Sequence, residues 1–425
     1  MLISSKVSKV LVLVTLALGV RLAAAPSTNE PADRVARWQE DIGVYAKELP
    51  MRHVNFSTLI RRQDFDAAVA ELKDNVPQLS DAELVFGLMR ITARLGVAHT
   101  AIAFGSAGRP GGLHFYPIDF QWFSDGLAVI AAPVEYREAI GCRVVRMGSK
   151  TPTDAEAAVA PYISHENAAF LHVESPRYFT IAELMRQTGI ADSDGRMQLT
   201  LARTNGQEFT IELRLGGGKS GRRLQAADEL SIPTPLSRKH PGTAYWYEYL
   251  PDQRALFIQY NRCADDKNAP FAAFTQSLLA FADAHPVDRI IMDLRFNAGG
   301  SSTIIRPLES GLRARPALTA PGKVYVLIAG RTFSSGVFAV MEFRRDLHAT
   351  LVGEPTGNKP NHYGYQQWFL LPNSKLRVDY SIRHWILMPG ADPDAVMPDV
   401  AAPYSLQDFL AGRDPAFEAA LNARR

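Results

Sequence analysis

The 425-residue chain is 47% hydrophobic and 21% charged, and its formal net charge is +2. These values are ordinary for a globular protein and argue against a disordered, collagen-like or repeat protein. A nearly balanced charge without a basic stripe leaves no electrostatic footprint for nucleic acid, so no nucleic-acid partner is expected. The length predicts two or three domains.

The first 25 residues have the layout of a cleavable signal peptide. Lys6 and Lys9 precede an apolar run at residues 10–20, and small residues at 23–25 end before Pro26. The run is short for a membrane-spanning helix, although an uncleaved anchor remains the alternative. We expect residues 1–25 to be a signal peptide, the protein to be secreted or periplasmic, and no stable membrane insertion after cleavage.

Residues 26–104 are predicted to be helical. Apolar residues recur at spacings of three and four in Ala32–Lys47, Phe65–Asn75 and Ser80–Leu95. Ser80 and Glu83 have the spacing of a capping box at the start of the third helix. A break rich in glycine and proline, Gly105 to Gly112, ends this region.

Residues 113–215 show a mixed pattern of short strands with one or two helices between them. Strands are predicted at Gly126–Ala132, Arg143–Met147, Gln198–Arg203 and Phe209–Leu213, and a helix at Thr153–Val159. Asn205-Gly206 is a favourable hairpin turn between the last two strands. We expect an α+β module here, followed by a linker over residues 216–244.

Residues 245–425 alternate buried strands with helices. The strand predictions are Ala255–Tyr260, Arg289–Leu294, Val324–Ala329 and Thr350–Gly353, and the helix predictions are Phe271–Ala284, Ser335–Phe343 and Pro415–Arg425. Continuous apolar strands joined by helices are typical of a parallel sheet that is covered on both faces. The expected fold class is therefore α/β, with this stretch as one domain.

The two cysteines, Cys142 and Cys263, could form a disulfide in an oxidising compartment or remain as separate buried thiols. The sequence leaves both possibilities open. It contains neither a His-Glu-x-x-His motif nor a paired-cysteine motif, so no metal or other cofactor is expected.

Ser334 is the strongest candidate for a nucleophile. It follows the buried strand at 324–329 and stands directly before a predicted helix. Unpaired backbone N–H groups and the positive end of the helix dipole are found at such a position, and both stabilise negative charge on an attacked carbonyl. An ordinary helix-capping serine is the alternative reading of this segment.

Gly299 and Gly300 follow the strand at 289–294. Glycines at the carboxyl end of a parallel strand allow the backbone to approach a ligand closely, and their N–H groups can bind an oxyanion. A plain glycine turn is the alternative.

Several motifs, in the same order, resemble the C-terminal-processing peptidase and tricorn family of serine peptidases, which includes the tail-specific proteases. The matching segments are Arg94–Thr100, Asp293–Gly300, Thr332–Ser334, Gly353–Lys359 and Asp392–Asp399. The resemblance implies that residues 245–425 form a crotonase/Clp protease-like catalytic domain and that residues 113–215 form a PDZ-like module. It also implies that Ser334 is the nucleophile, with Ser335 as the alternative. The oxyanion hole would consist of the N–H groups of Ser335 and of Gly299 or Gly300.

The family uses two kinds of general base, and the sequence offers both. Lys359 occupies the place of the lysine base, whereas His99 and Asp392 occupy the places of a histidine base and the acid that orients it. We favour His99 because an imidazole titrates near neutrality, while a lysine must be desolvated to act as a base. His362, close to Lys359 in sequence, could contact substrate.

Three departures from the family pattern affect this assignment. Val97 stands where an aspartate usually precedes the histidine, and Val337 stands where the lysine branch has a glutamate. Asp392 replaces a commoner glutamate, and Asp394 is its nearest substitute. These departures concern mainly the third catalytic member.

These features together predict an exported serine endopeptidase that acts on peptide or protein substrates through an acyl-enzyme on Ser334. The alternatives are a non-catalytic peptide- or ligand-binding protein on the same fold, an acyl hydrolase of small esters, and a Ser-Lys processing peptidase that uses Lys359. The sequence leaves open whether the protein forms a homo-oligomer.

Overall fold

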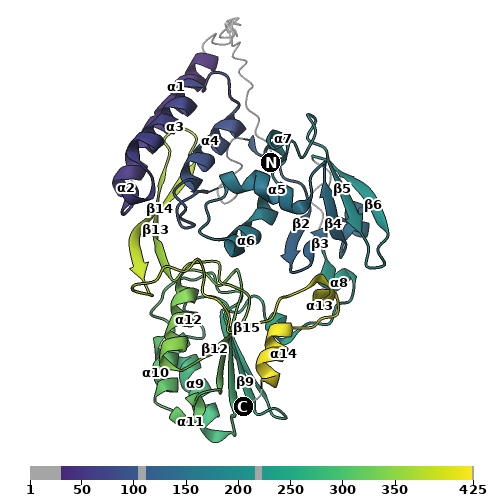
Figure 1. The fold of residues 1–425 in the computed structure, drawn as a ribbon, viewed down its shortest axis with the longest axis vertical. Helices are drawn as coiled ribbons and strands as arrows, with labels where there is room; N and C mark the ends of the chain where they lie inside the picture. The colour runs from purple at the N-terminus through teal and green to yellow at the C-terminus, as the bar shows by residue number, and fades with distance from the viewer. Residues whose placement is uncertain (1–29, 104–111, 216–222, 424–425) are drawn as a thin grey trace, which may run out of the picture.

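The computed structural model of the protein describes residues 30–103, 112–215 and 223–423. These residues form a helical part, a mixed module and an α/β part, each with its own sheet. The helical part and the mixed module lie side by side at one end of the α/β part (Figure 1). The predicted signal peptide and most of the predicted break at 105–112 lie outside the described residues.

The helical part matches the predicted N-terminal helices. Its helices are α1 (Glu30–Arg52), α2 (Phe56–Leu59), α3 (Arg62–Asp74) and α4 (Asp81–Ala93). The capping box is confirmed, since Ser80 Oγ accepts from the N–H of Glu83 at 3.3 Å and the Glu83 carboxylate accepts from the N–H of Ser80 at 2.8 Å. The capping box fixes the start of α4, and the loop that carries His99 follows the other end of this helix.

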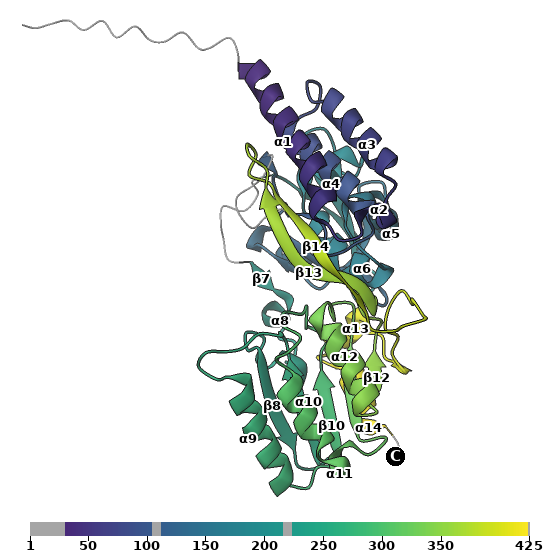
Figure 2. The ribbon, with the colours of Figure 1, turned by 90° about the vertical axis from the view of Figure 1, so that its left-hand side faces the viewer.

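A long hairpin from the C-terminal half of the chain packs against these helices. Strands β13 (Asn361–Leu370) and β14 (Arg377–Ile386) pair with each other, and β14 also pairs with β1 (Ile102–Ala103). Figure 2 shows the hairpin running along the helical part and away from the α/β sheet. The α/β sheet is therefore not built from the whole of residues 245–425, because residues 361–386 join the helical part. This arrangement brings His362 beside the loop that carries His99.

The mixed module contains the predicted strands and hairpin turn. Its antiparallel order is β2-β3-β4-β5-β6, and the strands are β2 (Asp119–Phe123), β3 (Gly126–Ala132), β4 (Arg143–Met147), β5 (Met197–Ala202) and β6 (Glu208–Leu213). The short strand β7 (Leu224–Gln225) pairs with β3. The helices are α5 (Pro152–Val159), α6 (Ala168–Tyr178) and α7 (Ala182–Gln187). Helix α6, which the sequence analysis did not predict, lies against the edge strand β2.

The α/β part has a six-stranded sheet in the order β15-β12-β11-β10-β9-β8. Its strands are β8 (Tyr245–Leu250), β9 (Ala255–Tyr260), β10 (Arg289–Asp293), β11 (Val324–Ile328), β12 (Thr350–Gly353) and β15 (Val400–Ala401). All pairs are parallel except β8–β9. The larger helices are α9 (Phe271–Ala284), α10 (Arg306–Arg313), α12 (Ser335–Asp346) and α14 (Pro415–Asn422); the shorter ones are α8 (Ala226–Glu229), α11 (Pro316–Thr319) and α13 (Leu406–Leu410). The α/β fold class is confirmed.

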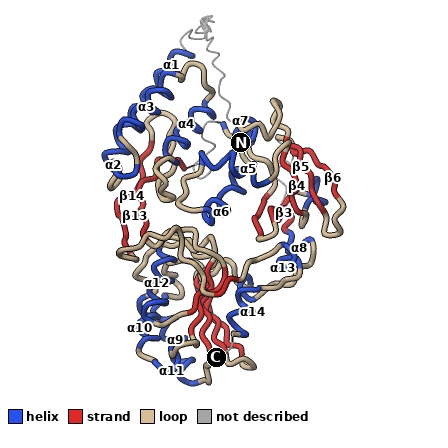
Figure 3. Tube along the Cα trace, in the orientation of Figure 1, coloured by secondary structure: helices blue, strands red, loops and turns tan. Residues whose placement is uncertain are grey.

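Helices cover both faces of this sheet, which explains the continuous apolar strands. Ile290 and Met292 of β10 belong to the core formed with α9, α10 and α12, whereas Ile291 packs on the opposite side with residues of α14. The loops that follow the strands gather at the end of the sheet that faces the other two parts (Figure 3). In parallel α/β sheets this carboxyl end is where ligands bind.

Cys142 and Cys263 are both buried and do not form a disulfide. Burial is the main reason that the pKa of Cys263 is raised, to about 11, which keeps this thiol protonated at neutral pH. Of the helices within the described ranges, none is both long and apolar enough to cross a membrane.

Candidate active site

Ser334 lies at the junction between β11 and α12 in a backbone conformation that is unusual for serine. Its φ of 51° and ψ of −125° lie outside the regions that side-chain-bearing residues commonly adopt. Its backbone N–H donates to Oδ1 of Asn358 at 2.9 Å, which helps to hold this geometry. Strained residues of this kind cluster at functional sites because the surrounding structure has to enforce them. The Ser334 side chain is half-buried.

The loop that carries Ser334 is bound to the loop that follows β10. The hydroxyl of the fully buried Thr332 donates to the carbonyl of Leu294 at 2.9 Å, and the N–H of Phe333 donates to the carbonyl of Asn297 at 2.9 Å. The two strand-end loops are therefore joined by direct hydrogen bonds. This explains how motifs far apart in sequence meet at one end of the sheet.

Gly299 is in close contact with the Ser334 backbone. A Cβ at position 299 would lie 2.7 Å from Ser334 Cβ and 2.9 Å from the backbone nitrogen of Ser335, and the φ of Gly299 is +100°. A side chain at position 299 would therefore collide with the turn that carries Ser334. Both the close approach and the backbone conformation require glycine.

Two backbone N–H groups near Ser334 have no acceptor among the described residues: those of Gly300 and Ser335. The N–H of Gly299 differs, because it donates to Oδ1 of Asn297 at 2.9 Å. The hydroxyl of Ser335 donates to the carbonyl of Gly300 at 2.7 Å and is therefore engaged. Of the three predicted oxyanion donors, Gly300 and Ser335 have free N–H groups.

His99 lies in the loop after α4 and stacks on the residue that precedes Ser334. Its ring and the ring of Phe333 have centroids 4.6 Å apart with an interplanar angle of 24°. Phe333 also stacks on Phe170 of α6 at 4.6 Å. The turn that carries the nucleophile is therefore packed against both the helical part and the mixed module.

The His99 imidazole makes no hydrogen bond or ion pair with any residue that the structure describes. It is only 8% exposed, and its Nδ1 is completely enclosed without a partner. Burial, with a smaller contribution from His362, lowers the pKa of His99 to about 3, so the ring is neutral at physiological pH. The predicted hydrogen bond to the Ser334 hydroxyl and the predicted contact with Asp392 are both absent from this structure.

His362, the residue predicted to contact substrate, is buried beside His99 on β13. Their rings lie 5.9 Å apart and nearly parallel, at 11°. His362 Nδ1 donates to the carbonyl of Lys359 at 2.9 Å. Burial lowers the pKa of His362 to about 4, and backbone hydrogen bonds oppose this shift. The ring is 2% exposed and packs beside the ring of His99.

Lys359 and Asp392, which the sequence placed in alternative catalytic roles, bind each other. Lys359 Nζ lies 2.8 Å from Asp392 Oδ2 and 3.7 Å from Asp394 Oδ1. The side chains of Asp392 and Asp394 are 62% and 86% exposed, so both carboxylates face solvent. Burial opposes ionisation of Lys359, but the hydrogen bond and charge of Asp392 outweigh it and raise the pKa of the amine above its usual value. Lys359 is therefore a protonated cation at neutral pH.

Glu166 is a residue of this site that the sequence analysis missed. It precedes α6, and its carboxylate accepts from Asn358 Nδ2 and, at 3.4 Å, from the N–H of Lys359. Its Oε1 is enclosed and unpartnered. Burial raises the pKa of Glu166 to about 7 although hydrogen bonds from Lys359, Asn358 and Ala98 oppose the shift. No motif marks this residue, because tertiary packing alone brings it to the site.

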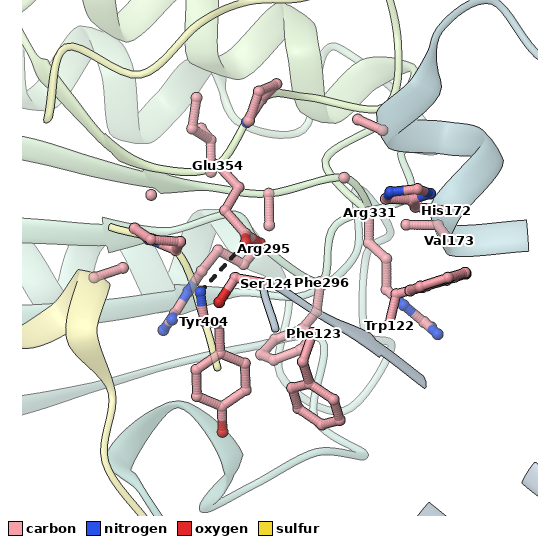
Figure 4. Close-up of a pocket in the computed structure, with 18 of the residues that line it drawn as sticks. Trp122, Phe123, Ser124, His172, Val173, Arg295, Phe296, Arg331, Glu354 and Tyr404 are labelled. Atoms are coloured by element: carbon pink, nitrogen blue, oxygen red, sulfur yellow. Dashed lines mark hydrogen bonds between the residues drawn. The ribbon is translucent and has the colours of Figure 1, made fainter. Parts of the chain in front are cut away.

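A cleft of about 1160 Å³ lies between the mixed module and the α/β part. Figure 4 shows Trp122 and His172 on one side of it, with Arg331 beside them and Glu354 and Tyr404 further along. The rings of Trp122 and His172 are stacked at 4.9 Å. Ser334 and His99 do not line the cleft, but its wall includes residues 328–331, which lead directly to Ser334.

Comparisons with known proteins show similarity in structure only. No protein-family description and no curated protein matches the sequence. The solved structure of mature CPAF complexed with lactacystin has a TM-score of 0.61 and 13% identity, with 91% of this chain and 97% of that chain covered. A second structure of mature CPAF has a TM-score of 0.60 and 14% identity, covering 91% of this chain and 96% of that chain.

The photosystem II D1 C-terminal processing protease also matches, with a TM-score of 0.40 and 13% identity over 89% of this chain and 98% of that chain. The CPAF matches extend over nearly the whole of both chains, so they concern the complete arrangement and not a single domain. The chain therefore shares the fold of mature CPAF over nearly its whole length.

Proposed function

We propose that this protein is an exported serine endopeptidase that cleaves peptide bonds through an acyl-enzyme on Ser334. The observation that carries the proposal is the Ser334 backbone, held at φ 51° at the start of α12 beside the free N–H groups of Gly300 and Ser335. A serine on a strained strand-to-helix turn next to two unpaired donors is the arrangement that acyl transfer requires. Ser335 is a poorer candidate, since its hydroxyl is bound to Gly300.

In the proposed reaction His99 acts as the general base. Its Nε2 takes the proton of the Ser334 hydroxyl while Oγ bonds to the carbonyl carbon of the substrate. The N–H groups of Gly300 and Ser335 bind the resulting oxyanion. His99 then returns the proton to the leaving amine. In the second half of the reaction water attacks the acyl group, His99 takes the proton of the water, and this proton returns to the Ser334 oxygen as the acid product leaves. Because Ser334 and His99 are not hydrogen-bonded here, substrate binding has to bring them together, as is common in unliganded enzymes.

The surroundings of Lys359 favour His99 as the base. A lysine acts as a base only when its pKa falls toward neutrality, and Asp392 raises the pKa of Lys359. The Ser-Lys alternative would require the pair with Asp392 to break first. Burial keeps His99 neutral at pH 7, so it is ready to accept a proton.

The large cleft supports a polymeric substrate. It leads along residues 328–331 toward Ser334 and has both aromatic and charged walls, which suits an extended peptide better than a small ester. We propose that the mixed module is PDZ-like and that the α/β part is a crotonase/Clp-like catalytic domain, with the substrate chain lying between them.

A fluorophosphonate probe tests the proposed nucleophile. The Ser334 oxygen would displace fluoride from phosphorus and leave a covalent adduct that mass spectrometry can assign to this residue. Wild type should react and Ser334→Ala should not, while Ser335→Ala should retain the reaction. Lactacystin, which is bound in one of the CPAF structures, is a second probe. Comparing turnover of peptides with turnover of small esters separates a peptidase from an acyl hydrolase.

One observation favours a non-catalytic binding protein as the second candidate function. Neither the Ser334 hydroxyl nor His99 makes a hydrogen bond within the described residues, so the triad is not assembled. If the wild-type protein gives no adduct with either probe and still binds peptides, the binding function replaces the catalytic one.

Export rests on the predicted signal peptide at residues 1–25. Expression of the full chain in a Gram-negative bacterium, followed by cell fractionation and N-terminal sequencing, tests it. A mature N-terminus at Pro26 in the periplasm or medium would support export, and a full-length cytoplasmic product would contradict it.

A further inference from the structure

Two enclosed polar atoms at the site lack partners, and they have complementary chemistry. His99 Nδ1 and Glu166 Oε1 are both shielded from solvent and neither has a hydrogen-bond partner among the described residues. An unsatisfied buried polar group costs about 1–3 kcal/mol, so such atoms are rare and call for a reason. One atom belongs to an imidazole that can donate a proton, and the other belongs to a carboxylate that can accept one.

Both residues belong to the same small region of the molecule. The N–H of Ala98, which directly precedes His99, approaches the Glu166 carboxylate closely enough to lower its pKa. Glu166 is also bound to Asn358, whose Oδ1 accepts the N–H of Ser334. A chain of contacts therefore runs from the nucleophile's backbone to the glutamate and on to the segment that carries the histidine.

The position of Glu166 is fixed by its neighbour in the sequence. Asn167 caps α6 and donates from Nδ2 to the carbonyls of Thr356 at 3.0 Å and Asp394 at 2.8 Å. These bonds anchor the start of α6 on the loops around Lys359. The Glu166 carboxylate therefore stands directly beside an anchored helix start, which favours a fixed position.

Asp392, the acid predicted from the sequence, does not contact Nδ1 of His99. Asp392 is bound to Lys359 and is 62% exposed, whereas the unpartnered Nδ1 of His99 lies in an enclosed environment. A water-exposed carboxylate that is already paired with a cation is poorly suited to orient a buried imidazole. Glu166 has an enclosed oxygen free for the purpose.

We propose that Glu166 is the positioning carboxylate of this site: it accepts a hydrogen bond from Nδ1 of His99 and thereby directs Nε2 toward the Ser334 hydroxyl. The inference rests on the proposed peptidase function. One of the two side chains has to rotate to make the contact, because they are not hydrogen-bonded in this structure. During acylation the Ser334 proton moves to Nε2, the Nδ1 proton stays on the ring, and Glu166 remains a carboxylate.

The contact would lower the free-energy cost of ionising His99 and Glu166 in their buried positions. Burial lowers the pKa of His99 to about 3 and raises that of Glu166 to about 7, so each neutral form is favoured while the groups are apart. Placed together, the imidazolium favours the carboxylate and the carboxylate favours the imidazolium. The paired imidazole is then a stronger base than the isolated buried ring.

The other ionisable groups around this pair do not replace Glu166. They are His362 and His384 of the β13–β14 hairpin and Lys359 with its partners Asp392 and Asp394. His362 disfavours a protonated His99, and the aspartates are engaged with Lys359. Glu166 is the acidic group in this set that has an enclosed oxygen without a partner among the described residues.

Glu166→Gln tests the proposal with little disturbance of the scaffold. Its side-chain carbonyl can still accept from Asn358 and Lys359, but the negative charge is lost. We expect fluorophosphonate labelling and peptide kcat/KM to fall by about 100-fold or more, mainly in kcat. Glu309→Gln is the matched control, since Glu309 of α10 also has a pKa raised to about 7, largely by burial, but its acidic neighbours are Asp346 and Glu342. It should retain wild-type labelling.

A purely structural role would not change how His99 titrates. We expect NMR titration of the His99 ring to give a lower pKa in Glu166→Gln than in wild type, and the rising limb of the labelling-rate profile to move to lower pH. Asp392→Asn should lose less activity than Glu166→Gln. If Glu166→Gln does not fold, Glu166→Asp, which withdraws the carboxylate by one methylene, should give an intermediate loss.

The outcomes separate this inference from the proposed function. If wild type is labelled at Ser334 but Glu166→Gln has the wild-type rate and the same His99 pKa, the positioning role is wrong and the peptidase proposal stands. The same conclusion follows if Asp392→Asn alone lowers the rate. If wild type is not labelled, the peptidase proposal fails, and the His99 titration in wild type and Glu166→Gln then decides whether the contact exists.

Discussion

Lys359 Nζ lies 2.8 Å from Oδ2 of Asp392, so the residues predicted for two different catalytic mechanisms form one ion pair. The pair sits at the surface end of the site, where the Lys359 side chain is 21% exposed and that of Asp392 is 62% exposed. Partly exposed pairs of this kind contribute little to stability, about 0–1 kcal/mol. Their main consequence is chemical, because the pair holds a positive charge close to Glu166 and keeps Lys359 from accepting a proton.

The first prediction compares the two candidate bases. Lys359→Met should retain more fluorophosphonate labelling of Ser334 than His99→Ala, which should lose about 100-fold or more, because the buried histidine is neutral and the lysine is protonated at pH 7. Labelling rates at pH 7 measure both effects. Loss of labelling in Lys359→Met together with normal labelling in His99→Ala would reverse the assignment.

The second prediction concerns the strain stored at Ser334. A non-glycine residue at φ 51°, ψ −125° costs about 1–3 kcal/mol, and glycine removes most of this cost while adding less than about 1 kcal/mol of unfolded-state entropy. Ser334→Gly should therefore be more stable than Ser334→Ala by about 1 kcal/mol, and neither should be labelled. Urea denaturation of the two variants measures the difference. Equal midpoints would mean that the strain at this position is no larger than the entropy cost of glycine.

Features set by local pattern could be predicted from the sequence. The strands β9, β10 and β11 are continuous apolar runs, and α9 has the bounds that its periodicity indicates. Ser334 and the two glycines were found because strand, turn and helix follow one another directly in the chain. In such cases the residues that define the feature are also neighbours in sequence.

Features set by distant contacts could not be predicted in this way. Glu166 reaches the site because Asn167 docks on the loop at Thr356, a contact between residues almost 200 positions apart. The sequence predicted that the segment of β13 and β14 belongs to the α/β domain, but β14 pairs with β1 instead. The alternation of apolar and polar residues along a strand does not specify its partner strand. Helix α6 was missed because it is short and contains Pro176.

The third prediction tests the close approach of Gly299 to the nucleophile. A Cβ on residue 299 would lie 2.9 Å from the backbone nitrogen of Ser335 and would displace one oxyanion donor. Gly299→Ala should therefore lower the labelling rate by about 100-fold, the usual effect of losing such a donor. Gly322→Ala is the matched control, because Gly322 also has a positive φ, +80°, but its Cβ would meet nothing within 4 Å. A rate loss shared by both variants would point to general destabilisation.

The fourth prediction concerns the pH dependence of stability and uses His53, a buried histidine outside the site. Its Nδ1 donates to the carbonyl of Val54 at 2.6 Å, and its Nε2 lies 2.9 Å from the hydroxyl of Thr100. Burial lowers the pKa of His53 to about 4, an effect that the bond to Val54 only partly offsets. Between pH 6.5 and pH 4 the unfolded chain therefore binds a proton that the folded chain does not, and stability falls as the pH is lowered.

Other groups titrate over the same range, so the effect of His53 has to be isolated by substitution. His99 and His362 affect stability in the same direction as His53. Glu166 and Glu309 act in the opposite direction, because their raised pKa values make the folded protein less stable as the pH rises from 4.5 to 7. His53→Gln should reduce the stability lost between pH 7 and pH 4.5 by about 2 kcal/mol relative to wild type. Urea midpoints at the two pH values measure this difference, which does not depend on how far the substitution itself destabilises the protein. An unchanged pH dependence would mean that the folded protein binds a proton at His53 as readily as the unfolded chain does.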